Sequence, residues 1–328
     1  FHESKITISL PHLWINELGL LPKSNLCDVI HVCNYDYITA IPPIIVKKKF
    51  SIPLLITNDA LMGTGNYSFG STLLDLLSGI YTHSVGTRVL KNYDKIVLLY
   101  SQLSEEAKKL GVPEKKIEII PNGVDIEKLN HYKEHFKTED LRKKYGVNAN
   151  EKVILYVGRL VKLKRVEIIT KIVEKLLDQG LKVKALIVGD GPQRARLEKI
   201  AHRVCGNIVF TGFLSEEKYE CYGIADLFVL PSISEGLPTV LLEAAAFGLP
   251  MIATNTNGVS DIVIHGNTGF LVNKWSYGQY ANFAQRILTD DDLARKIGEN
   301  ARNHVEKNFS WATIAKKYEA VYEGLLNR

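Results

Sequence analysis

Two carboxylates stand eight positions apart within residues 231–263, and both need an explanation. Glu235 comes just before a run with helical spacing, and Glu243 lies inside that run among small and apolar residues. A carboxylate in such surroundings is costly to bury unless a partner hydrogen-bonds to it. Residues at this separation project from nearly the same face of a helix, about two turns apart. The free N–H groups of the helix start lie between them, and such groups bind phosphate.

A ligand with hydroxyls at both ends and a diphosphate between them fits this arrangement, and a nucleotide sugar is such a ligand. The other interpretation is structural: Glu235 caps the helix, and Glu243 points into solvent. Short motifs of this kind often occur by chance. The stretch by itself therefore leaves both interpretations open.

The elements around the two carboxylates are predicted to be a strand, a loop, a helix and a second strand. The apolar run 225–230 predicts a buried strand, and residues 239–247 have the spacing of a helix. Residues 248–250 end that helix, because glycine suits a C-cap and proline cannot continue it. A further strand begins at Met251. This order is the repeating unit of a parallel α/β sheet.

Strands alternate with helices along the rest of the chain. Further strands are predicted at 29–32, 52–57, 95–99, 117–120, 152–157, 182–188 and 207–211. Further helices are predicted at 71–90, 104–111, about 166–177 and 194–202, with a last one from 311. The charged segment 128–150 is interpreted as a connection between domains. With 328 residues, the chain is long enough for two doubly wound α/β domains.

Three other segments give weak or no indications of structure and function. Residues before 27 show no clear pattern. Residues 58–70 follow a strand, where binding loops of open sheets lie, so they are equally compatible with an acceptor-side loop and with an ordinary surface loop. Pro42 and Pro43 interrupt an apolar run, and the three lysines at 47–49 are most simply a solvated corner, with an anionic-lipid contact as the alternative.

Composition narrows the classes of protein. A hydrophobic content of 46% with 23% charged residues is that of an ordinary soluble globular protein. The net charge of +5 is mild and gives little reason to expect a nucleic-acid partner, and no apolar stretch is long enough to span a bilayer. The four cysteines form no CxxC pair, which favours free thiols in a reducing compartment: Cys27, Cys33, Cys205 and Cys221.

With these pieces in order, the chain resembles the GT-B glycosyltransferases of family GT4. The motifs that carry the resemblance are PNGVD (121–125), GRLVKLK (158–164), VGDGP (188–192), TGF (211–213), ADLFVLPS (225–232) and the two glutamates in E-x7-E spacing. Each motif is weak alone, but their order and spacing are specific. The resemblance covers the chain from about Lys95 to its C-terminal end.

The resemblance implies a fold of two Rossmann-like doubly wound domains that face each other across a cleft. Residues 1–140 would form the N-terminal, acceptor-side domain, and residues 141–310 the C-terminal domain that binds the nucleotide sugar. Residues 311–328 would form a helix that packs back on the N-terminal domain. Nothing before Val29 matches the family's first strand and its glycine-rich loop, so the first domain is expected to lack its first strands.

The implied activity is that of a retaining, metal-independent hexosyltransferase. The donor would be a nucleotide-diphosphate sugar, and the acceptor a glycan, a lipid-linked carrier or a small molecule. Arg159 and Lys164 would contact the donor diphosphate, while Glu235 would hold hydroxyls of the donor sugar. Two fixed cations and a helix start can neutralise the leaving diphosphate without a metal. No cofactor is expected, and the structural alternative for Arg159 and Lys164 is a pair of solvated cations.

The resemblance also implies the donor-binding residues. Glu243 would accept hydrogen bonds from the ribose hydroxyls, and backbone N–H groups would meet the phosphates and the sugar. The full predicted set is Gly158, Gly189, Gly212, Phe213, Leu214, Gly236, Leu237, Pro238, Thr239 and Glu243. Expected partners are a nucleotide sugar and a glycan or lipid-linked acceptor, with a peripheral membrane contact as an option and no nucleic acid. The expected location is the cytoplasm, with the cytoplasmic face of the membrane as a variant.

Departures from the family pattern keep other functions open. Cys33 and Asn58 stand where many relatives have histidines, so no general base is assigned. His31 and His83 are available, but a histidine within an apolar strand is usually only packed. A non-catalytic domain that binds a sugar nucleotide and a sugar-nucleotide epimerase are the alternatives. A nicotinamide dehydrogenase is disfavoured, because residues 189–192 do not extend to GxGxxG.

Overall fold

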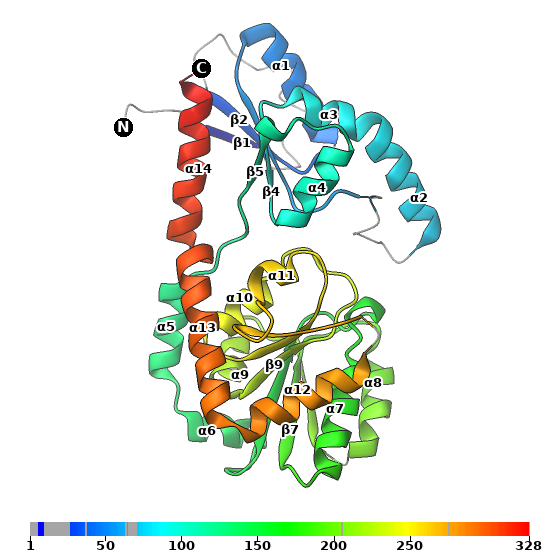
Figure 1. The fold of residues 1–328 in the computed structure, drawn as a ribbon, viewed down its shortest axis with the longest axis vertical. Coiled ribbons are helices and arrows are strands. Elements are labelled where there is room, and N and C mark those ends of the chain that lie inside the picture. Colours follow the sequence, from blue (N-terminus) through cyan, green and yellow to red (C-terminus); the bar gives the residue numbers. More distant parts are fainter. Residues whose placement is uncertain are drawn as a thin grey trace. The chain divides into compact units, whose positions relative to one another are not determined.

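The structure is a computed structural model, and it describes residues 6–9, 27–36, 38–62, 64, 71–204, 206–274 and 276–327 (Figure 1). Contacts between residues divide the chain into two compact units. Unit 1 comprises residues 1–122 and 312–328, and unit 2 comprises residues 123–311. The segment predicted to connect the domains is largely helical: α5 (Ile126–His135) and α6 (Thr138–Lys144) both contact α9 (Lys218–Ile224) within unit 2.

Unit 1 is built on a parallel sheet whose described strands follow the order of the chain. The strands are β1 (Ile6–Ser9), β2 (Val29–Cys33), β3 (Leu54–Asn58), β4 (Lys95–Leu98) and β5 (Ile117–Ile119). Right-handed crossovers between strands in this order place every connecting helix on the same side of the sheet. These helices are α1 (Pro42–Phe50), α2 (Thr72–Tyr81), α3 (Thr87–Asn92) and α4 (Ser101–Lys109). A π-helical turn, Thr82–Gly86, joins α2 to α3.

Three features of unit 1 correct the sequence-based expectations. The strand β1 lies ahead of Val29, where none was expected, because an alternating run of four residues is too short to stand out. The helix α1 begins at Pro42, although the proline pair was interpreted as a break, since a first helical turn needs no proline N–H. The helix α4 begins at Ser101 and not at residue 104. The expectation that no glycine-rich loop precedes Val29 concerns residues outside the described ranges, and most of the predicted binding loop 58–70 lies outside them as well.

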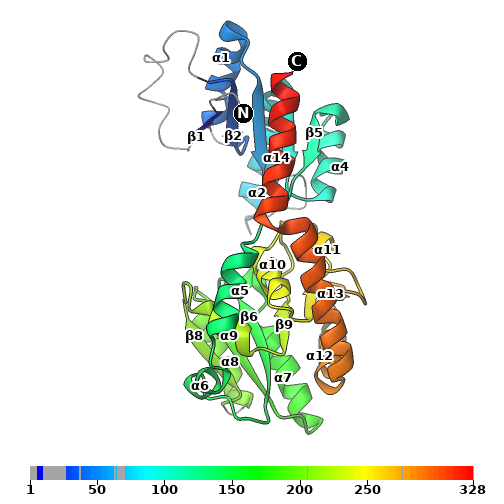
Figure 2. The same cartoon turned by 90° about the vertical axis from the view of Figure 1, so that its left-hand side faces the viewer.

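The C-terminal helix α14 (Trp311–Leu326) packs against the side of the unit 1 sheet opposite to α1–α4 (Figures 1 and 2). Ile314, Val321 and Leu325 of this helix form a buried core with sheet residues. The sheet residues are Val29, Leu55, Val97 and Ile120. The apolar side chains on this face of α14 therefore serve packing, with Tyr318 and Tyr322 at the border of the same core.

A hydrogen-bonded cluster joins α14 to the strands at the same place. The imidazole Nδ1 of His31 lies 2.8 Å from the Tyr322 hydroxyl, and its Nε2 lies 2.8 Å from Oγ1 of Thr57. The hydroxyls of Thr57 and Tyr318 are 3.1 Å apart. Burial lowers the pKa of His31 to about 4, so the ring is neutral near neutral pH. His31 is thus packed, as its position in an apolar strand indicates.

Unit 2 contains a doubly wound parallel sheet with the strand order β11-β10-β9-β6-β7-β8. The chain begins in the middle, runs outward on one side, and then returns to build the other side. The strands are β6 (Lys152–Val157), β7 (Val183–Val188), β8 (Ile208–Gly212), β9 (Leu227–Leu230), β10 (Met251–Thr254) and β11 (Gly269–Val272). The order reverses between β6 and β9, and ligands of open α/β sheets bind outside the carboxyl ends of strands at such a point. The two parallel sheets confirm the predicted α/β fold class.

Helices cover both faces of the unit 2 sheet (Figure 1). Besides α5, α6 and α9, they are α7 (Glu167–Asp178), α8 (Arg194–Ala201), α10 (Thr239–Ala246), α11 (Val259–Ile262), α12 (Tyr277–Thr289) and α13 (Asp291–Phe309). A short 3₁₀ helix, Lys162–Lys164, precedes α7. Among the described residues, no helix has the length and apolar character needed to cross a membrane.

Candidate functional site

Two glycine-containing loops meet at the carboxyl edge of the unit 2 sheet. Gly158 follows β6 and donates its N–H to the Val188 carbonyl at 3.0 Å, while the N–H of Leu160 reaches the Asp190 carbonyl at 2.8 Å. Gly189, which follows β7, donates to the Gly212 carbonyl at 2.8 Å. Backbone hydrogen bonds therefore fix three of the predicted donor-binding glycines against one another. They make this edge rigid before any side chain is considered.

The close approach of these loops explains why glycine is required at position 189. Its φ is +134°, and a Cβ built there would lie 2.0 Å from the carbonyl oxygen of Gly158. Gly191 is in the same situation, since its Cβ would lie 2.6 Å from the Leu160 carbonyl oxygen. No side chain fits such distances, and the positive φ is itself unfavourable for other residues. The glycines of the VGDGP motif are thus explained by backbone contact.

Lys164 and Glu235, which are far apart in sequence, form an ion pair. The Lys164 ammonium donates to Oε1 of Glu235 at 2.6 Å, and the side chain of Glu235 is only 9% exposed. The N–H of Ile233 also donates to the Leu163 carbonyl at 3.0 Å, which ties the loop after β9 to the 3₁₀ helix. Asn257 steadies the same loop through a 3.0 Å hydrogen bond to the Glu235 carbonyl. The solvated-cation interpretation is therefore wrong for Lys164.

Tyr156 lies beneath this pair. Burial, and secondarily the charge of Glu235, raises the pKa of its phenol well above the usual range. The hydroxyl therefore stays protonated, and it donates to the Arg159 carbonyl at 3.1 Å. This contact fixes the backbone of the residue whose exposed guanidinium is predicted to meet the diphosphate.

Glu235 does not cap the helix that follows it. The helix α10 begins at Thr239, its N-cap position is Pro238, and no side chain caps it. Glu235 therefore lies in the preceding loop, and the assumption that it shares a helix face with Glu243 is wrong. Gly236 and Leu237 complete the loop, which leads directly into the uncapped helix start.

Glu243 is buried, with 8% of its surface exposed, so the interpretation as a solvated residue is also wrong. Its Oε1 accepts a 2.6 Å hydrogen bond from the Lys218 ammonium, and its Oε2 accepts one of 2.9 Å from the Tyr222 hydroxyl. Lys218 and Tyr222 lie one turn apart on α9 and thus on one face of that helix. The sequence analysis singled out neither residue.

An open pocket of about 420 Å³ collects several of these groups. Lys218 belongs to its lining, so the cation that holds Glu243 also faces the pocket. Five predicted site residues are in the lining as well: Gly158, Arg159, Gly189, Phe213 and Leu214. The side chain of Phe213 is 78% exposed, which is unusual for a large apolar residue.

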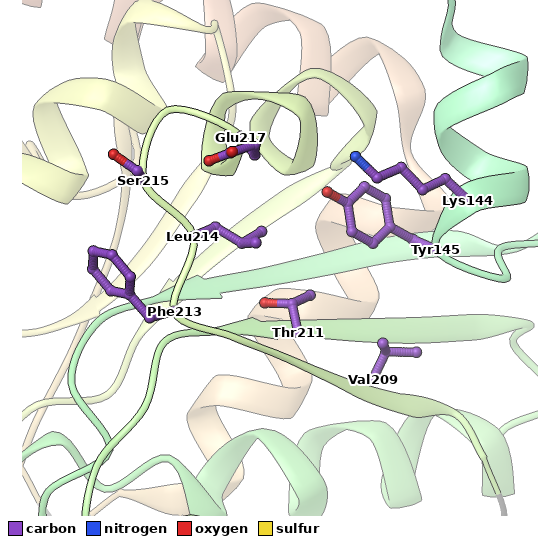
Figure 3. Close-up of a pocket in the computed structure, with 8 residues that line it drawn as sticks. All are labelled: Lys144, Tyr145, Val209, Thr211, Phe213, Leu214, Ser215 and Glu217. Atoms are coloured by element: carbon purple, nitrogen blue, oxygen red, sulfur yellow. The ribbon is translucent and has the colours of Figure 1, made fainter.

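A second open pocket shares part of its lining with the first (Figure 3). Phe213, Leu214 and Ser215 contribute to both pockets. The remaining lining residues are Lys144 and Tyr145 at the end of α6, Val209 and Thr211 on β8, and Glu217 (Figure 3). The loop that carries Phe213 therefore separates two open spaces, with its aromatic ring exposed.

Two hydroxyls at the same edge of the sheet lack partners. Ser232, after β9, and Thr256, after β10, are buried, and neither side-chain oxygen has a hydrogen-bond partner in the described part of the chain. Buried hydroxyls are normally satisfied, so these two are candidates for contact with a ligand or water. The sequence analysis did not single them out. Within the described ranges, no group of three metal-ligating His, Cys, Asp or Glu side chains occurs.

The corresponding edge of unit 1 carries the two positions where the resemblance led us to look for histidines. Cys33 lies partly exposed at the end of β2, and partial desolvation, followed by the charge of Asp59, raises the pKa of its thiol. Asn58, at the end of β3, is fully buried, and its Oδ1 accepts the N–H of Tyr35 at 2.8 Å. Its Nδ2 has no partner among the described residues. His83 is exposed on the π-helical turn, and its Nδ1 lies 2.9 Å from the Gly79 carbonyl oxygen.

Comparison with known families gives two matches. The family model described as "Glycosyl transferases group 1" matches residues 137–304, and the one described as "Glycosyltransferase Family 4" matches residues 8–128. The chain is 30% identical to the N-acetyl-alpha-D-glucosaminyl L-malate synthase of Bacillus anthracis, over 72% of this chain and 61% of that protein. It is 32% identical to the D-inositol 3-phosphate glycosyltransferase of Corynebacterium jeikeium, over 64% and 52%. The chain thus spans between half and two thirds of these curated relatives.

Solved structures share the fold. A sucrose-phosphate synthase from Thermosynechococcus elongatus has a TM-score of 0.74 and 26% identity, over 92% of this chain and 74% of that one. Anabaena HepE, solved in complex with UDP and glucose, has a TM-score of 0.74 and 20% identity, over 91% and 78%. The second likeness concerns the fold alone.

Proposed function

The chain belongs to the family of group 1 glycosyl transferases and has the GT-B fold, and from this premise we propose that it transfers a hexose from a nucleotide-diphosphate sugar to an acceptor hydroxyl. The observation that carries the proposal is the Lys164–Glu235 pair, held at the carboxyl edge of the unit 2 sheet. Beside it are the rigid glycine loops and the uncapped start of α10. A cation, a carboxylate and free backbone N–H groups are the three things that a sugar diphosphate needs.

The cations act on the leaving group. In the proposed reaction the bond between the sugar's anomeric carbon and the diphosphate oxygen breaks, and negative charge develops on that oxygen. Arg159, Lys164 and the N-terminus of α10 stabilise this charge, which gives the rate enhancement expected of preorganised donors. With the positive field supplied by the chain itself, we expect transfer without a divalent metal or other cofactor.

Glu235 orients the sugar. Its carboxylate accepts hydrogen bonds from hydroxyls of the hexose, and its ion pair with Lys164 keeps it in place before the donor arrives. The acceptor hydroxyl attacks from the face that the diphosphate leaves, and its proton passes to the departing diphosphate oxygen, so the anomeric configuration is retained. This route needs no nucleophile from the enzyme, and we assign none.

Glu243 binds the other end of the donor. Its carboxylate is held by Lys218 and Tyr222, and Lys218 also lines the pocket that contains Phe213 and Leu214. We assign the ribose hydroxyls to Glu243 and the base to the neighbourhood of Phe213. The fold neighbour HepE was solved with UDP and glucose, which supports a donor of this class.

The acceptor is assigned more broadly, to glycans, lipid-linked carriers and small hydroxylated molecules. The two curated relatives are named for transfer to L-malate and to inositol phosphate, so the family accepts varied hydroxyls. A place of action at the cytoplasmic face of the membrane fits a lipid-linked acceptor.

The buried amide of Asn58, in place of a histidine, favours one second candidate, a domain that binds a sugar nucleotide without transferring it.

A thermal-shift screen against UDP-, GDP- and ADP-sugars tests the proposal. A true donor at about one hundred times its dissociation constant should stabilise the protein by about 2.7 kcal/mol. Donor consumption is then measured with and without candidate acceptors, and the anomeric configuration of the product is read by NMR. Absence of stabilisation by every sugar nucleotide contradicts the proposal. Stabilisation without transfer or hydrolysis supports the non-catalytic candidate instead.

A further inference from the structure

Arg165 has a backbone conformation that is unusual for an arginine. It follows the 3₁₀ helix Lys162–Lys164 with a φ of +50° and a ψ of +41°, in the left-handed region. Glycine is the usual residue at such a helix end, because a side chain is strained there. Strain of this kind persists only where surrounding contacts hold it, and it often occurs at functional sites. The residue before it is Lys164, which pairs with Glu235.

The side chain of Arg165 makes contacts that hold this conformation. The residue is buried, with 7% of its surface exposed. Its Nη1 donates to the Lys274 carbonyl at 2.9 Å, and its Nη2 donates to the Tyr277 hydroxyl. The guanidinium also lies 4.6 Å from the centre of the Tyr277 ring. A planar guanidinium can bind both partners at once, which the single ammonium of a lysine does not reproduce. We call these three contacts the Arg165 clamp.

The Arg165 clamp fastens the loop between β6 and α7 to the start of α12. Lys274 lies shortly before α12, and Tyr277 is the first residue of that helix. The helix α12 in turn packs alongside α7 (Figures 1 and 2). The ammonium of Lys171, on α7, lies 4.6 Å from the centre of the same tyrosine ring. The loop is therefore anchored to a part of unit 2 that is itself held by packing.

Adjacent side chains of this loop bind different parts of unit 2. Lys164 binds Glu235 in the loop after β9, whereas Arg165 binds the start of α12. The N–H of Arg165 also donates to the Lys162 carbonyl at 3.2 Å, which closes the 3₁₀ turn that carries Lys164. The direction of the Lys164 side chain therefore depends on the left-handed turn that follows it. A change of that turn would move the ammonium away from its partner.

We propose that Arg165 is a positioning residue for Lys164. The Arg165 clamp holds the left-handed turn, and the turn orients the Lys164 ammonium towards Glu235 and the donor diphosphate. This inference rests on the proposed function, in which Lys164 stabilises the leaving diphosphate, and it adds a residue that acts only through Lys164. The position of that ammonium matters because a displacement of about 1 Å in an active site can cost about a hundredfold in rate.

Two substitutions at position 165 separate the turn from the side chain. Arg165→Ala removes the clamp and leaves a residue that disfavours the left-handed region, so kcat should fall roughly tenfold to a hundredfold. Arg165→Gly removes the same clamp but adopts the turn without strain, so it should recover most of that loss. A side chain that serves only packing predicts the opposite order, because glycine fills less space and is more flexible. Initial rates at saturating donor and acceptor measure both variants.

A double variant tests whether Arg165 acts through Lys164. Once Lys164→Ala has removed the ammonium, Arg165→Ala has nothing left to displace. It should then lower kcat by less than about twofold further, since the two residues act as one unit. If instead the two separate losses multiply in the double variant, Arg165 does not act through Lys164.

Matched controls come from other cations that lie on aromatic rings in unit 2. Lys171→Ala removes the second cation from the Tyr277 ring. Arg286→Ala removes an exposed arginine that lies 5.6 Å from the centre of the Phe270 ring. Neither residue adjoins the 3₁₀ helix in the chain, so neither substitution should change kcat. Thermal melts show whether each variant is folded.

Chemical labelling of lysines tests the position of Lys164 without any turnover. Reductive methylation of the folded protein, located by tandem mass spectrometry, gives a rate for each lysine. The Lys164 side chain is paired and 20% exposed, so Arg165→Ala should raise its rate several-fold. The rate of Lys162, which is exposed in the same 3₁₀ helix, should not change. If Arg165→Ala does not fold, Tyr277→Phe removes only the hydroxyl of the clamp and should raise the rate of Lys164 in the same direction.

Failure of the inference and failure of the proposed function can be told apart. Unchanged labelling of Lys164 in the folded variants overturns the positioning role of Arg165. Equal kcat in the parent and in Arg165→Ala overturns it as well, as does a glycine variant that is slower than the alanine variant. A parent protein that transfers no sugar contradicts the proposed function, and the labelling rates alone then decide whether Arg165 holds Lys164 in place.

Discussion

The carboxyl edges of the two sheets are organised in different ways. In unit 2 the loops are tied by backbone hydrogen bonds, and two carboxylates are paired with lysines, Glu235 with Lys164 and Glu243 with Lys218. The groups left without partners there, among the described residues, are the neutral hydroxyls of Ser232 and Thr256. In unit 1 the Nδ2 of Asn58 is buried without a partner among the described residues. Oε1 of Glu106 is likewise buried without a hydrogen-bond partner among the described residues. The other carboxylate oxygen of Glu106 accepts a hydrogen bond from Thr64, in the loop after β3.

In the proposed function, the carboxyl edge of the unit 2 sheet binds the donor, and it is called the donor edge below. A diphosphate is bound through close backbone approach and fixed positive charge, so the residue types needed at that edge can be encoded in short motifs. Acceptors differ in shape and chemistry, so the proposal requires no particular residue type at the unit 1 edge. Five experiments, four on substituted proteins and one with a chelator, would test this comparison.

Gly189→Ala should have the largest effect. The new Cβ would meet the Gly158 carbonyl oxygen at 2.0 Å, and the residue sits at a φ of +134°. We expect the free energy of unfolding to fall by about 4 kcal/mol or more, the range of severe core defects. The control is Gly278→Ala, where a Cβ meets nothing within 4 Å. It should leave stability unchanged or raise it by about 0.5–1 kcal/mol. Equal denaturant midpoints for the two variants would show that the donor edge is not rigid.

Lys164→Ala should reduce turnover roughly a hundredfold or more, as the loss of a preorganised charge-stabilising donor does. The effect should appear in kcat more than in the binding of the donor. Lys162→Ala, in the same 3₁₀ helix, is the matched control, because Lys162 is exposed and should not affect turnover. If the folded Lys164→Ala variant keeps full activity, the ion pair with Glu235 has a structural role only.

Replacement of His31, in unit 1, should change the stability of the protein and not its turnover. His31 has a folded-state pKa of about 4, below the unfolded value of 6.5, because burial disfavours the charged ring. Its contribution to stability is therefore complete above pH 6.5 and is lost as the pH falls towards 4, by roughly 3 kcal/mol in total. Tyr318 and Tyr322 stay protonated over this window, since burial raises the pKa of both.

His31→Gln should remove that part of the acid dependence, which denaturant titrations between pH 7 and 4.5 would measure. At neutral pH the variant should keep its turnover. A variant that retains the acid dependence but loses turnover would instead make His31 a catalytic group. Unit 1 would then also carry a residue that takes part in the chemistry.

The two glutamates of the donor edge should respond differently. Glu243→Gln should weaken donor binding about tenfold to a hundredfold, whichever sugar is attached, because a hydrogen bond to a charged group is lost. Glu235→Gln should act mainly on turnover, because the sugar is the part that changes charge in the transition state. Calorimetry and initial rates on both variants separate these effects. If both substitutions lower only the melting temperature, and neither donor binding nor turnover changes, Glu235 and Glu243 have structural roles only.

Addition of EDTA should have the smallest effect. Arg159, Lys164 and the start of α10 supply the positive field, so initial rates should be unchanged after the chelator is added. Rates that fall to zero and return with magnesium or manganese would require a metal at the donor edge.

The sequence predicted the sheets well, because apolar runs and glycine breaks mark buried parallel strands directly. It did not predict that Lys164 and Glu235 pair with each other, because the contact joins loops that are far apart in the chain. It missed Lys218 and Tyr222, because they belong to a helix whose packing against α10 is a tertiary contact. It missed β1 and the start of α1, where the pattern is short or a proline conceals it. The exposure of the leucines of α2 could not be predicted, since an apolar run gives no indication of which face meets water.

The packing of α14 on the unit 1 sheet has a consequence for how the protein is made. A ribosome completes residues 1–122 first, yet Val29, Leu55 and Val97 stay uncovered until Ile314 and Leu325 have emerged. Unit 2 is contiguous, so all of its residues are available earlier. The unit that is begun first is therefore closed last, which reverses the usual N-terminal-first order of domain folding during synthesis. Throughout translation of unit 2, this face of the unit 1 sheet therefore lacks the helix that covers it in the folded protein.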